Sequence, residues 1–182
     1  MLRDSIQLKR FEQVVLPHLD AALQLARWLT RNEEDARDIV QESYLRALRF
    51  FGSFHGEDAR VWLLKIVRNT CYSWIKQNRP WELAASFDEV MHSGAAADLT
   101  PESLVLEKAE RVTLLYGLGQ LRVEWREALV LREVEGLSYR QIACITSVPI
   151  GTVMSRLYRA RTRLQELVRS EGDRRSAGVR ES

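Results

Sequence analysis

Apolar residues recur along most of the chain at three- and four-residue intervals, which is the spacing of amphipathic helices. Helical patterning of this kind covers residues 11–30, 33–51, 59–77, 102–118, 123–135, 138–146 and 150–167. A short turn separates the last two runs, which is typical of a helix-turn-helix unit. We therefore expect an all-α protein of two small helical domains, the first with three to four helices and the second ending in a helix-turn-helix.

The helical pattern is interrupted between residues 80 and 101, where Pro80, Pro101 and a run of small residues favour loop structure. We expect residues 80–101 to be a flexible linker that joins a domain at 1–79 to a domain at 102–169, and residues 170–182 to be a disordered tail. The formal net charge is +3 over residues 1–79, −6 over 80–110 and +5 over 111–182. Two mildly basic domains with an acidic connector fit a protein that touches nucleic acid at two places.

The predicted helix after Asn32 has an outer face that is polar except for one leucine. Asn32 is expected to cap this helix, three acidic residues follow in its first turn, and Gly52 is expected to end it. A leucine set among polar residues is typical of a helix-on-helix protein interface, although a single exposed leucine needs no explanation. The residues of this face are Asp38, Gln41, Glu42, Leu45, Arg46 and Arg49.

The polar loop at residues 52–58 carries one aromatic residue, Phe54, and precedes the third predicted helix. Two interpretations remain open on periodicity and composition. Phe54 either packs back onto Trp62 as a small hydrophobic cover, or the loop forms a pocket for an unstacked base together with basic and aromatic residues of the helix.

The helix-turn-helix is predicted from its capping and turn residues. Gly136 suits the position that ends the preceding helix, and Ser138 with Gln141 forms the pattern of a capping box. Pro149 cannot continue a helix, so residues 147–149 are expected to form the turn. The second helix of the unit is then expected from about residue 150 to about 167.

The second helix of this unit places apolar and polar residues on opposite faces. Its apolar stripe is Val153, Leu157, Ala160 and Leu164, and its outer face and flanks hold polar, aromatic and basic residues without an acid. Such a face suits a helix in the DNA major groove, where its centre meets base edges and its flanks meet phosphates. The alternative is an ordinary solvated surface helix.

Composition excludes several classes of protein. The 182 residues include 46% hydrophobic and 29% charged residues, as expected for a folded globular protein. No cysteine or histidine spacing resembles a zinc site, no nucleotide-binding or nucleophile motif is present, and no apolar run is long enough to span a membrane. We expect a cytoplasmic, non-enzymatic protein without metal, cofactor or stable membrane insertion, in which Cys71 and Cys144 are buried thiols.

Two segments carry a resemblance to a known family. Residues 33–54 read EEDARDIVQESYLRALRFFGSF, and residues 126–164 read REALVLREVEGLSYRQIACITSVPIGTVMSRLYRARTRL. The first resembles the second conserved region of the sigma-2 domain, and the second resembles the sigma-4 domain. The chain is thus similar, from residue 11 to residue 167, to the extracytoplasmic function (ECF) group of sigma-70-family sigma factors.

This resemblance implies a function and a set of partners. A sigma factor binds core RNA polymerase and directs promoter-specific transcription initiation by recognising minus-10 and minus-35 elements of promoter DNA. An anti-sigma factor is a further expected partner. The resemblance assigns polymerase binding to Asp38, Gln41, Glu42, Leu45 and Arg46. It assigns minus-10 recognition and melting to the loop and third helix, with candidates Phe54, His55, Arg60, Lys65, Arg68 and Asn69. It assigns the minus-35 element to the second helix of the helix-turn-helix, with candidates Thr152, Met154, Ser155, Arg156, Tyr158, Arg159 and Arg163.

The chain departs from the family pattern in three places. Leu121-Arg122 stands where the family usually has Leu-Pro, Ser147 stands where it usually has glycine in the turn, and residues 76–79 are less basic than in many relatives. Two other classes of protein also account for parts of the chain. A stand-alone helix-turn-helix regulator accounts for residues 138–164 but not for the helix at 33–51, and an interaction adaptor leaves the basic face without a role.

Overall fold

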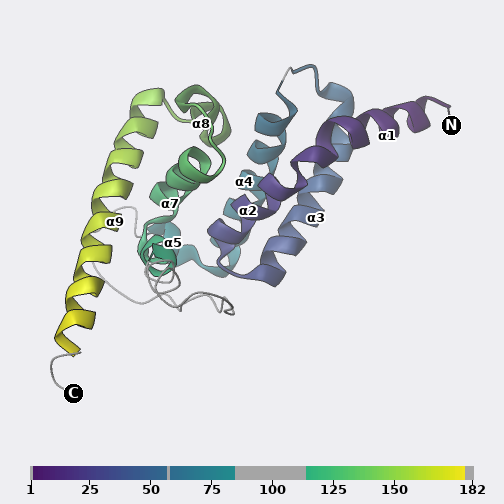
Figure 1. Ribbon diagram of the computed structural model, residues 1–182. Coiled ribbons are helices and arrows are strands. Elements are labelled where there is room, and N and C mark those ends of the chain that lie inside the picture. Colours follow the sequence, from purple (N-terminus) through teal and green to yellow (C-terminus); the bar gives the residue numbers. More distant parts are fainter. Residues whose placement is uncertain (1, 57, 85–113, 179–182) are drawn as a thin grey trace.

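The computed structural model describes residues 2–56, 58–84 and 114–178, with the backbone alone described for residues 2–6 and 171–178. Within these ranges all regular secondary structure is helical, and it forms two helical domains that lie side by side (Figure 1). The all-α architecture predicted from the sequence is confirmed. Residues 85–113, which hold most of the expected linker and part of the helix expected at 102–118, lie outside the described residues.

The first domain is built around three helices that pack against one another. Its elements are α1 (Leu2–Val15), the 3-10 turn η1 (Leu16–His18), α2 (Leu19–Thr30), α3 (Glu33–Phe50), the 3-10 turn η2 (Phe51–Ser53) and α4 (Ala59–Asn78). Helices α2, α3 and α4 bring their apolar stripes together in a shared core. Residues without solvent exposure in this core include Leu25, Leu29, Leu63, Leu64 and Val67. Burial of these apolar side chains is the main force that holds the domain together.

Side-chain caps fix where α3 and α4 begin. The Asn32 side-chain oxygen accepts hydrogen bonds from the backbone amides of Glu34 and Asp35, at 2.8 and 3.0 Å. The Asp58 carboxylate accepts one from the amide of Val61 at 2.9 Å. Each cap satisfies amide groups that the first helical turn leaves without a partner, so both starts follow from the sequence.

The single helix expected over residues 11–30 is broken in the structure. Helix α1 begins at Leu2, ends at Val15, and is followed by η1, which has Pro17 in its first positions. Proline lacks an amide hydrogen and its ring crowds the preceding turn, so an α-helix does not pass through it without distortion. The apolar period continues across the break, which is why periodicity alone missed it.

The second domain contains the predicted helix-turn-helix. Residues 114–120 are helical and are followed by α7 (Val123–Leu129), a π-helical turn η3 (Val130–Val134), α8 (Tyr139–Thr146) and α9 (Ile150–Gly178). The helix expected over 123–135 is present, with its last part π-helical. Leu131, Leu137, Ile142, Ile145 and Leu157 form the buried centre of this domain. Helices α8 and α9 are thereby held at a fixed angle by packing as well as by their connecting turn.

The two turns of the helix-turn-helix have the geometry that the sequence predicted. Ser138 and Gln141 form a complete capping box at the start of α8. Gly136, before it, has a φ of +65°, and Ser147, at the end of α8, has a φ of +56°. A serine tolerates this left-handed conformation at modest cost, so the family's usual glycine is not required for the turn.

The structure shows helix in two places where the sequence predicted flexible chain. Helix α5 spans Pro80–Ala84 at the start of the expected linker, and α9 continues to Gly178 within the expected tail. Proline is favoured in the first turn of a helix, where its missing amide hydrogen costs nothing. No proline follows Pro149, helix-favouring residues are frequent beyond it, and α9 continues through Gly172.

The two domains contact each other along two pairs of helices. Helix α4 of the first domain packs against α8 of the second, and α2 packs against α7 (Figure 1). This arrangement turns one side of α4 toward the second domain and leaves α3 on the opposite side of the first domain.

Candidate nucleic-acid interface

Helix α9 presents the polar face that the sequence predicted for reading DNA. Val153, Leu157 and Ala160 are buried, and Tyr158 on the opposite side has 72% of its surface exposed. Of the candidate residues, Thr152 and Arg156 are half-buried, and the exposed members are Met154, Ser155, Tyr158, Arg159 and Arg163. The face is therefore open to a partner as large as a DNA duplex.

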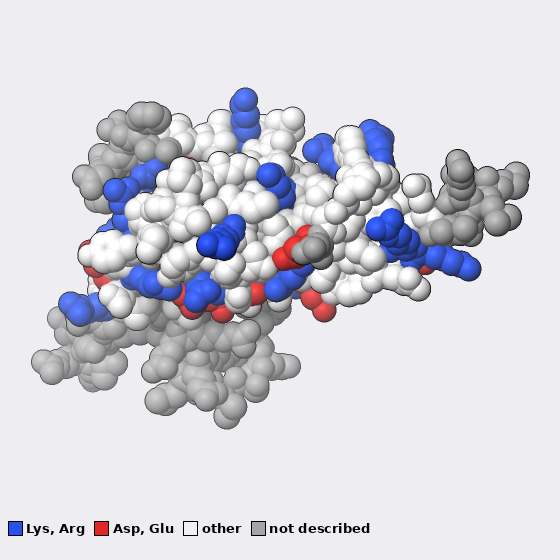
Figure 2. Space-filling model, turned by 90° about the horizontal axis from the view of Figure 1, so that it is seen from above, with Lys and Arg blue, Asp and Glu red and all other residues white. Residues whose placement is uncertain are grey.

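The cations on the flanks of this face make only weak contacts inside the protein. Arg161 pairs with Glu133 at 2.5 Å and Arg163 pairs with Glu166 at 3.0 Å, and all four side chains are about half exposed or more. Exposed ion pairs contribute little to stability, so both arginines can turn to a phosphate at small cost. Figure 2, which shows the molecule from above, has Lys and Arg side chains spread over the visible face, and the fewer acidic side chains lie near its middle and along its lower edge beside basic ones.

The outer face of α3 is also open. All five residues predicted to bind a partner are exposed, with Leu45 at 57%, and Arg46 pairs with Glu42 one turn away at 2.7 Å. Two further exposed apolar side chains, Leu48 and Phe50, lie near the end of the same helix. An apolar centre within a charged rim is the usual anatomy of a protein-binding surface.

Phe54 is buried rather than displayed on its loop. Its ring lies 4.9 Å from the Trp62 ring and 5.9 Å from the Phe51 ring, centroid to centroid, and only 8% of the residue is exposed. The neighbouring His55 is exposed, with its ring Nδ1 2.8 Å from the carbonyl oxygen of Ser53. In the free protein the phenyl ring therefore covers Trp62, as the first of the two interpretations held.

The candidate DNA-contacting side chains of α4 do not all face solvent. Asn69 is exposed and Lys65 is half-buried, but Arg60 and Arg68 contact acidic residues of the second domain. Arg60 pairs with Glu135 directly after η3, and Arg68 Nε donates to Glu127 Oε1 of α7 at 2.9 Å. The structure thus brings the helix expected to bind minus-10 DNA into direct contact with the second domain, which the sequence did not indicate.

Glu127 is the centre of this contact. It has no solvent exposure, and its second oxygen, Oε2, accepts a hydrogen bond from the Tyr72 hydroxyl at 2.9 Å. Burial raises the pKa of Glu127 above its ordinary value, while Arg68 and Tyr72 act in the opposite direction. Burial and the neighbouring Glu127 also raise the pKa of Tyr72 well above its ordinary value, so this hydroxyl remains a hydrogen-bond donor at neutral pH.

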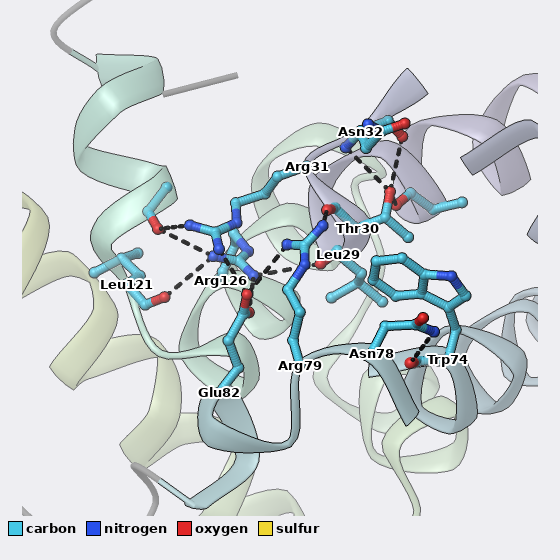
Figure 3. A network of polar contacts seen from close by, with 12 residues as sticks. Leu29, Thr30, Arg31, Asn32, Trp74, Asn78, Arg79, Glu82, Leu121 and Arg126 are labelled. Atoms are coloured by element: carbon cyan, nitrogen blue, oxygen red, sulfur yellow. Dashed lines mark hydrogen bonds and ion pairs between the residues drawn. The ribbon is translucent and has the colours of Figure 1, made fainter. Parts of the chain in front are cut away.

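A second polar cluster joins α2, α5 and α7 (Figure 3). The Glu82 carboxylate accepts from Arg31 at 2.6 Å, from Arg79 at 3.1 Å and from Arg126 at 3.3 Å. Arg126, which is almost wholly buried, also donates to the carbonyl oxygens of Leu29 and Leu121. Burial lowers the pKa of Arg126 to about 10, so it remains charged at neutral pH. Arginines at the carbonyl end of α2 are favourably placed for the helix dipole.

Sequence reasoning missed the interdomain residues Glu82, Arg126, Glu127 and Glu135. A signal for two of them was present, because Arg126 and Glu127 fall among the apolar positions of the run at 123–131. Charged residues in a buried stripe are rarely left without partners, so their placement indicates a polar contact with another element. Which element supplies the partners depends on how the domains pack, and no local pattern shows that.

Of the two cysteines, only one is buried as predicted. Cys71 lies in the core of the first domain, but Cys144 on α8 is exposed, because it falls on the outer side of that short helix. Burial raises the pKa of the Cys71 thiol well above its ordinary value. Among the described residues, no group of three or more His, Cys, Asp or Glu side chains is placed to hold a metal ion, and no helix is long and apolar enough to cross a membrane.

Comparisons with known protein families and proteins match both domains. The family model described as "Sigma-70 region 2" matches residues 14–80, and the one described as "Sigma-70, region 4" matches residues 111–164. The RNA polymerase sigma-H factor of Pseudomonas aeruginosa is 35% identical over 162 residues, covering 84% of this chain and 83% of that protein. The ECF RNA polymerase sigma-E factor of Escherichia coli K12 is 36% identical over 146 residues, covering 74% and 76%. The ECF RNA polymerase sigma factor SigE of Mycolicibacterium smegmatis is 30% identical over 166 residues, and the match spans 63% of its length.

Two solved structures share the fold. The sigma factor RpoE from Bartonella quintana, in complex with the anti-sigma factor NepR, matches with a TM-score of 0.69 and 32% identity over 88% of this chain and 98% of its own. CnrH, in complex with the cytosolic domain of CnrY, matches with a TM-score of 0.63 and 25% identity over 90% of each chain. Both matches extend over both helical domains.

Proposed function

Because this chain belongs to the extracytoplasmic function group of the sigma-70 family, we propose that it binds core RNA polymerase and directs promoter-specific initiation of transcription. It contributes no catalytic chemistry of its own and acts in the cytoplasm together with the polymerase. It supplies two surfaces that recognise DNA and one that binds the enzyme.

The first surface is the outer face of α9, which reads the minus-35 element in the major groove. Tyr158 and Arg159 lie at its centre with Met154 and Ser155, and Thr152, Arg156 and Arg163 lie toward its flank. Arginine suits this position because its fork of donors matches the acceptors of guanine. The turn between α8 and α9 fixes the angle at which the helix enters the groove.

The second surface is the loop before α4 together with α4 itself, which takes hold of the minus-10 element as it melts. Arg60, Lys65, Arg68 and Asn69 contact the separating strands, and the loop with its exposed His55 captures an unstacked base after the Phe54 ring leaves its place on Trp62. Capture of a base outside the helix offsets part of the cost of unstacking it, so binding and melting are coupled. Each surface alone binds weakly, and polymerase makes the second contact effectively intramolecular.

One observation carries this proposal: the outer faces of α3 and α9 are exposed at the same time, on different domains of one chain. A stand-alone helix-turn-helix regulator needs the α9 face but has no use for the α3 face with its exposed Leu45. A factor that bridges polymerase and promoter needs both. The complex of the sigma factor RpoE with the anti-sigma factor NepR further supports an anti-sigma factor as a partner of this chain.

A run-off transcription assay with purified core polymerase tests the proposal. Genomic fragments are transcribed with core enzyme alone and with core enzyme plus this protein, and the 5′ ends of the products are sequenced. We expect a small set of defined 5′ ends that appears only when the protein is added. Binding of the protein to DNA fragments without core enzyme, and no new 5′ ends with it, would instead identify a stand-alone regulator.

A further inference from the structure

One arginine of α9 is turned toward the inside of the second domain, although it lies on the flank of the DNA-reading face. Arg156 is half-buried, whereas the neighbouring Arg159 and Arg163 are exposed. We propose that Arg156 is a positioning residue, which fixes the orientation of α9 in the major groove through its charge beside Glu127, and that it makes no contact with a DNA phosphate. The inference deepens the proposed function and rests on it, because it concerns recognition of the same minus-35 element.

The helix places Arg156 at the border between the buried and the exposed side of α9. It lies one turn after Val153 and one turn before Ala160, both of which are buried, so the three residues share one side of the helix. Arg163 lies about two turns further on and therefore occupies the same flank. Its side chain is 52% exposed and pairs with Glu166 at 3.0 Å. The two arginines thus share a flank and differ in what surrounds them.

Part of the Arg156 guanidinium is closed off from a DNA backbone. Its Nη1 is buried and has no hydrogen-bond partner among the described residues. A phosphate reaches only those donors that solvent also reaches, so full contact with Arg156 requires its side chain to leave its place. Arg163, in contrast, makes an exposed ion pair, which exchanges for a phosphate at small cost.

Glu127 of α7 supplies the negative charge on the inner side of Arg156. Helices α7 and α9 pack against each other, and the Glu127 carboxylate has no solvent exposure. Burial raises the pKa of Glu127, and the positive charges of Arg68 and Arg156 act in the opposite direction, which places Arg156 within electrostatic range of the carboxylate. Away from solvent such an attraction is weakly screened, so it acts without a direct hydrogen bond.

Arg156 differs from Arg68 in belonging to the same domain as Glu127. Arg68 donates to Glu127 at 2.9 Å, but the proposed function assigns this arginine to the separating strands. Arg156 stays beside the carboxylate wherever the first domain lies. A buried charge that loses its partner is costly, so a cation from the same domain stabilises Glu127 at all times.

The way α9 sits on α7 decides where its base-reading side chains lie. Tyr158 and Arg159 closely follow Arg156 in the helix, and both are exposed on the face assigned to bases. A rotation or shift of α9 moves both side chains relative to the groove, and a binding group works only within about 0.5 Å of its productive position. Arg156 therefore affects base preference although it touches no base.

The test uses the complex of the full-length protein with core polymerase on a duplex promoter mapped by its 5′ end. Arg156→Gln and Arg163→Gln each remove one charge from the same flank, so the second variant is the matched control. Affinity is measured by fluorescence anisotropy for labelled promoters with the native or a scrambled upstream element, at several salt concentrations. The readouts are the ratio of native to scrambled affinity and the slope of log affinity against log salt concentration.

We expect Arg156→Gln to lower the affinity ratio about tenfold, as for the loss of one good base contact, and to leave the salt slope unchanged. Arg163→Gln should leave the ratio unchanged and make the slope shallower by about 0.9, the value for one lost phosphate contact.

Two further variants test whether Arg156 acts through Glu127. Glu127→Gln should lower the ratio by itself, and adding Arg156→Gln should then change it by about twofold or less, because the charge that Arg156 serves is gone. Arg156→Lys keeps a positive charge beside Glu127 and should retain most of the discrimination. If Arg156→Gln does not fold, as judged by circular dichroism, Arg156→Met, which keeps a long apolar side chain, replaces it in both comparisons.

A shallower salt slope with an unchanged ratio for Arg156→Gln would make Arg156 an ordinary phosphate contact and overturn the inference. An effect of Arg156→Gln that is equally large in the Glu127→Gln background would overturn it as well. The wild-type complex separates this inference from the proposed function. A wild-type complex that prefers the native element while Arg156→Gln behaves like Arg163→Gln contradicts the inference only, and a wild-type complex without any preference contradicts the proposed function.

Discussion

Arg68 and Glu127 meet across the domain boundary, with the guanidinium Nε 2.9 Å from a carboxylate that has no contact with solvent. One residue belongs to the helix assigned to melted DNA and the other to the domain assigned to the upstream element. The arrangement of the domains therefore places two segments proposed to bind promoter DNA in direct contact.

Arg159 should discriminate between base pairs at the upstream element. We expect Arg159→Ala to weaken binding of the polymerase complex to its own promoter by about 1–3 kcal/mol, the range for loss of a good base contact. Arg163→Ala is the control, since a flank cation meets phosphate and should weaken binding to native and scrambled upstream elements alike. Competition binding on both templates measures the difference. A larger change in base preference for Arg163→Ala than for Arg159→Ala would mean that the helix faces DNA differently.

Leu45 should act through polymerase and not through DNA. Leu45→Asp places an uncompensated charge in the proposed interface, so we expect it to abolish core binding in a pull-down while helicity and melting temperature stay near wild type. Leu8→Asp introduces the same charge at an exposed leucine of α1 and should retain core binding. Normal core affinity of a folded Leu45→Asp protein would remove this surface from the proposal.

Glu82 should make the stability of the protein sensitive to acid. Burial alone would raise its pKa, but Arg31, Arg126 and Arg79 together hold the pKa below the ordinary value of 4.5. For a carboxyl group whose pKa is lowered by folding, the stabilisation is present above that ordinary value and disappears as the pH falls through the pKa of the folded state.

Glu82→Gln should accordingly lower the free energy of unfolding at pH 7 by about 3 kcal/mol, because it leaves three arginines without their shared counter-charge. Its free energy of unfolding should also fall less steeply than that of the wild type as the pH drops below 5. Denaturant melts between pH 3 and pH 7 measure both effects, with the exposed Glu34→Gln as control. If the free energy of unfolding of Glu82→Gln fell below pH 5 as steeply as that of the wild type, the cluster would contribute nothing to the pH dependence of stability.

Phe54 should contribute to stability in the free protein. Its ring packs between Trp62 and Phe51, so Phe54→Ala is expected to lower the free energy of unfolding by about 3 kcal/mol. Phe54→Leu keeps an apolar side chain in the same space and should cost less. Wild-type stability of Phe54→Ala would show that the ring does not cover Trp62 in solution, and would favour a loop that is open before DNA arrives.

Much of the fold could be predicted from local chemistry. Asn32, Ser138 with Gln141, and Gly136 each satisfy a requirement of their own turn, so helix starts and the helix-turn-helix followed from the sequence. The faces of α3 and α9 followed as well, because a period of 3.6 residues sorts buried from exposed positions. The break at Pro17 was missed because the apolar pattern continues through it.

The contacts between the domains could not be predicted in this way. Arg60 and Arg68 have the same local pattern whether they face solvent, DNA or Glu127, since sequence spacing shows which side of a helix a residue occupies and not what covers that side. The same holds for Glu82, which lies in a short helix within the expected linker and gathers arginines that are distant in sequence. Buried charges in the apolar run at 123–131 remain the one sequence signal for such a contact.

Permanganate footprinting of a promoter mapped by its 5′ end tests the sigma factor assignment most directly. The reagent modifies unstacked thymines and is applied to the duplex with core polymerase alone, with this protein alone, and with both. We expect reactive thymines around the minus-10 element only when both are present, and their loss when Leu45→Asp replaces the wild-type protein. Thymines that stay unreactive although the protein and core enzyme are bound together at the promoter would contradict the assignment.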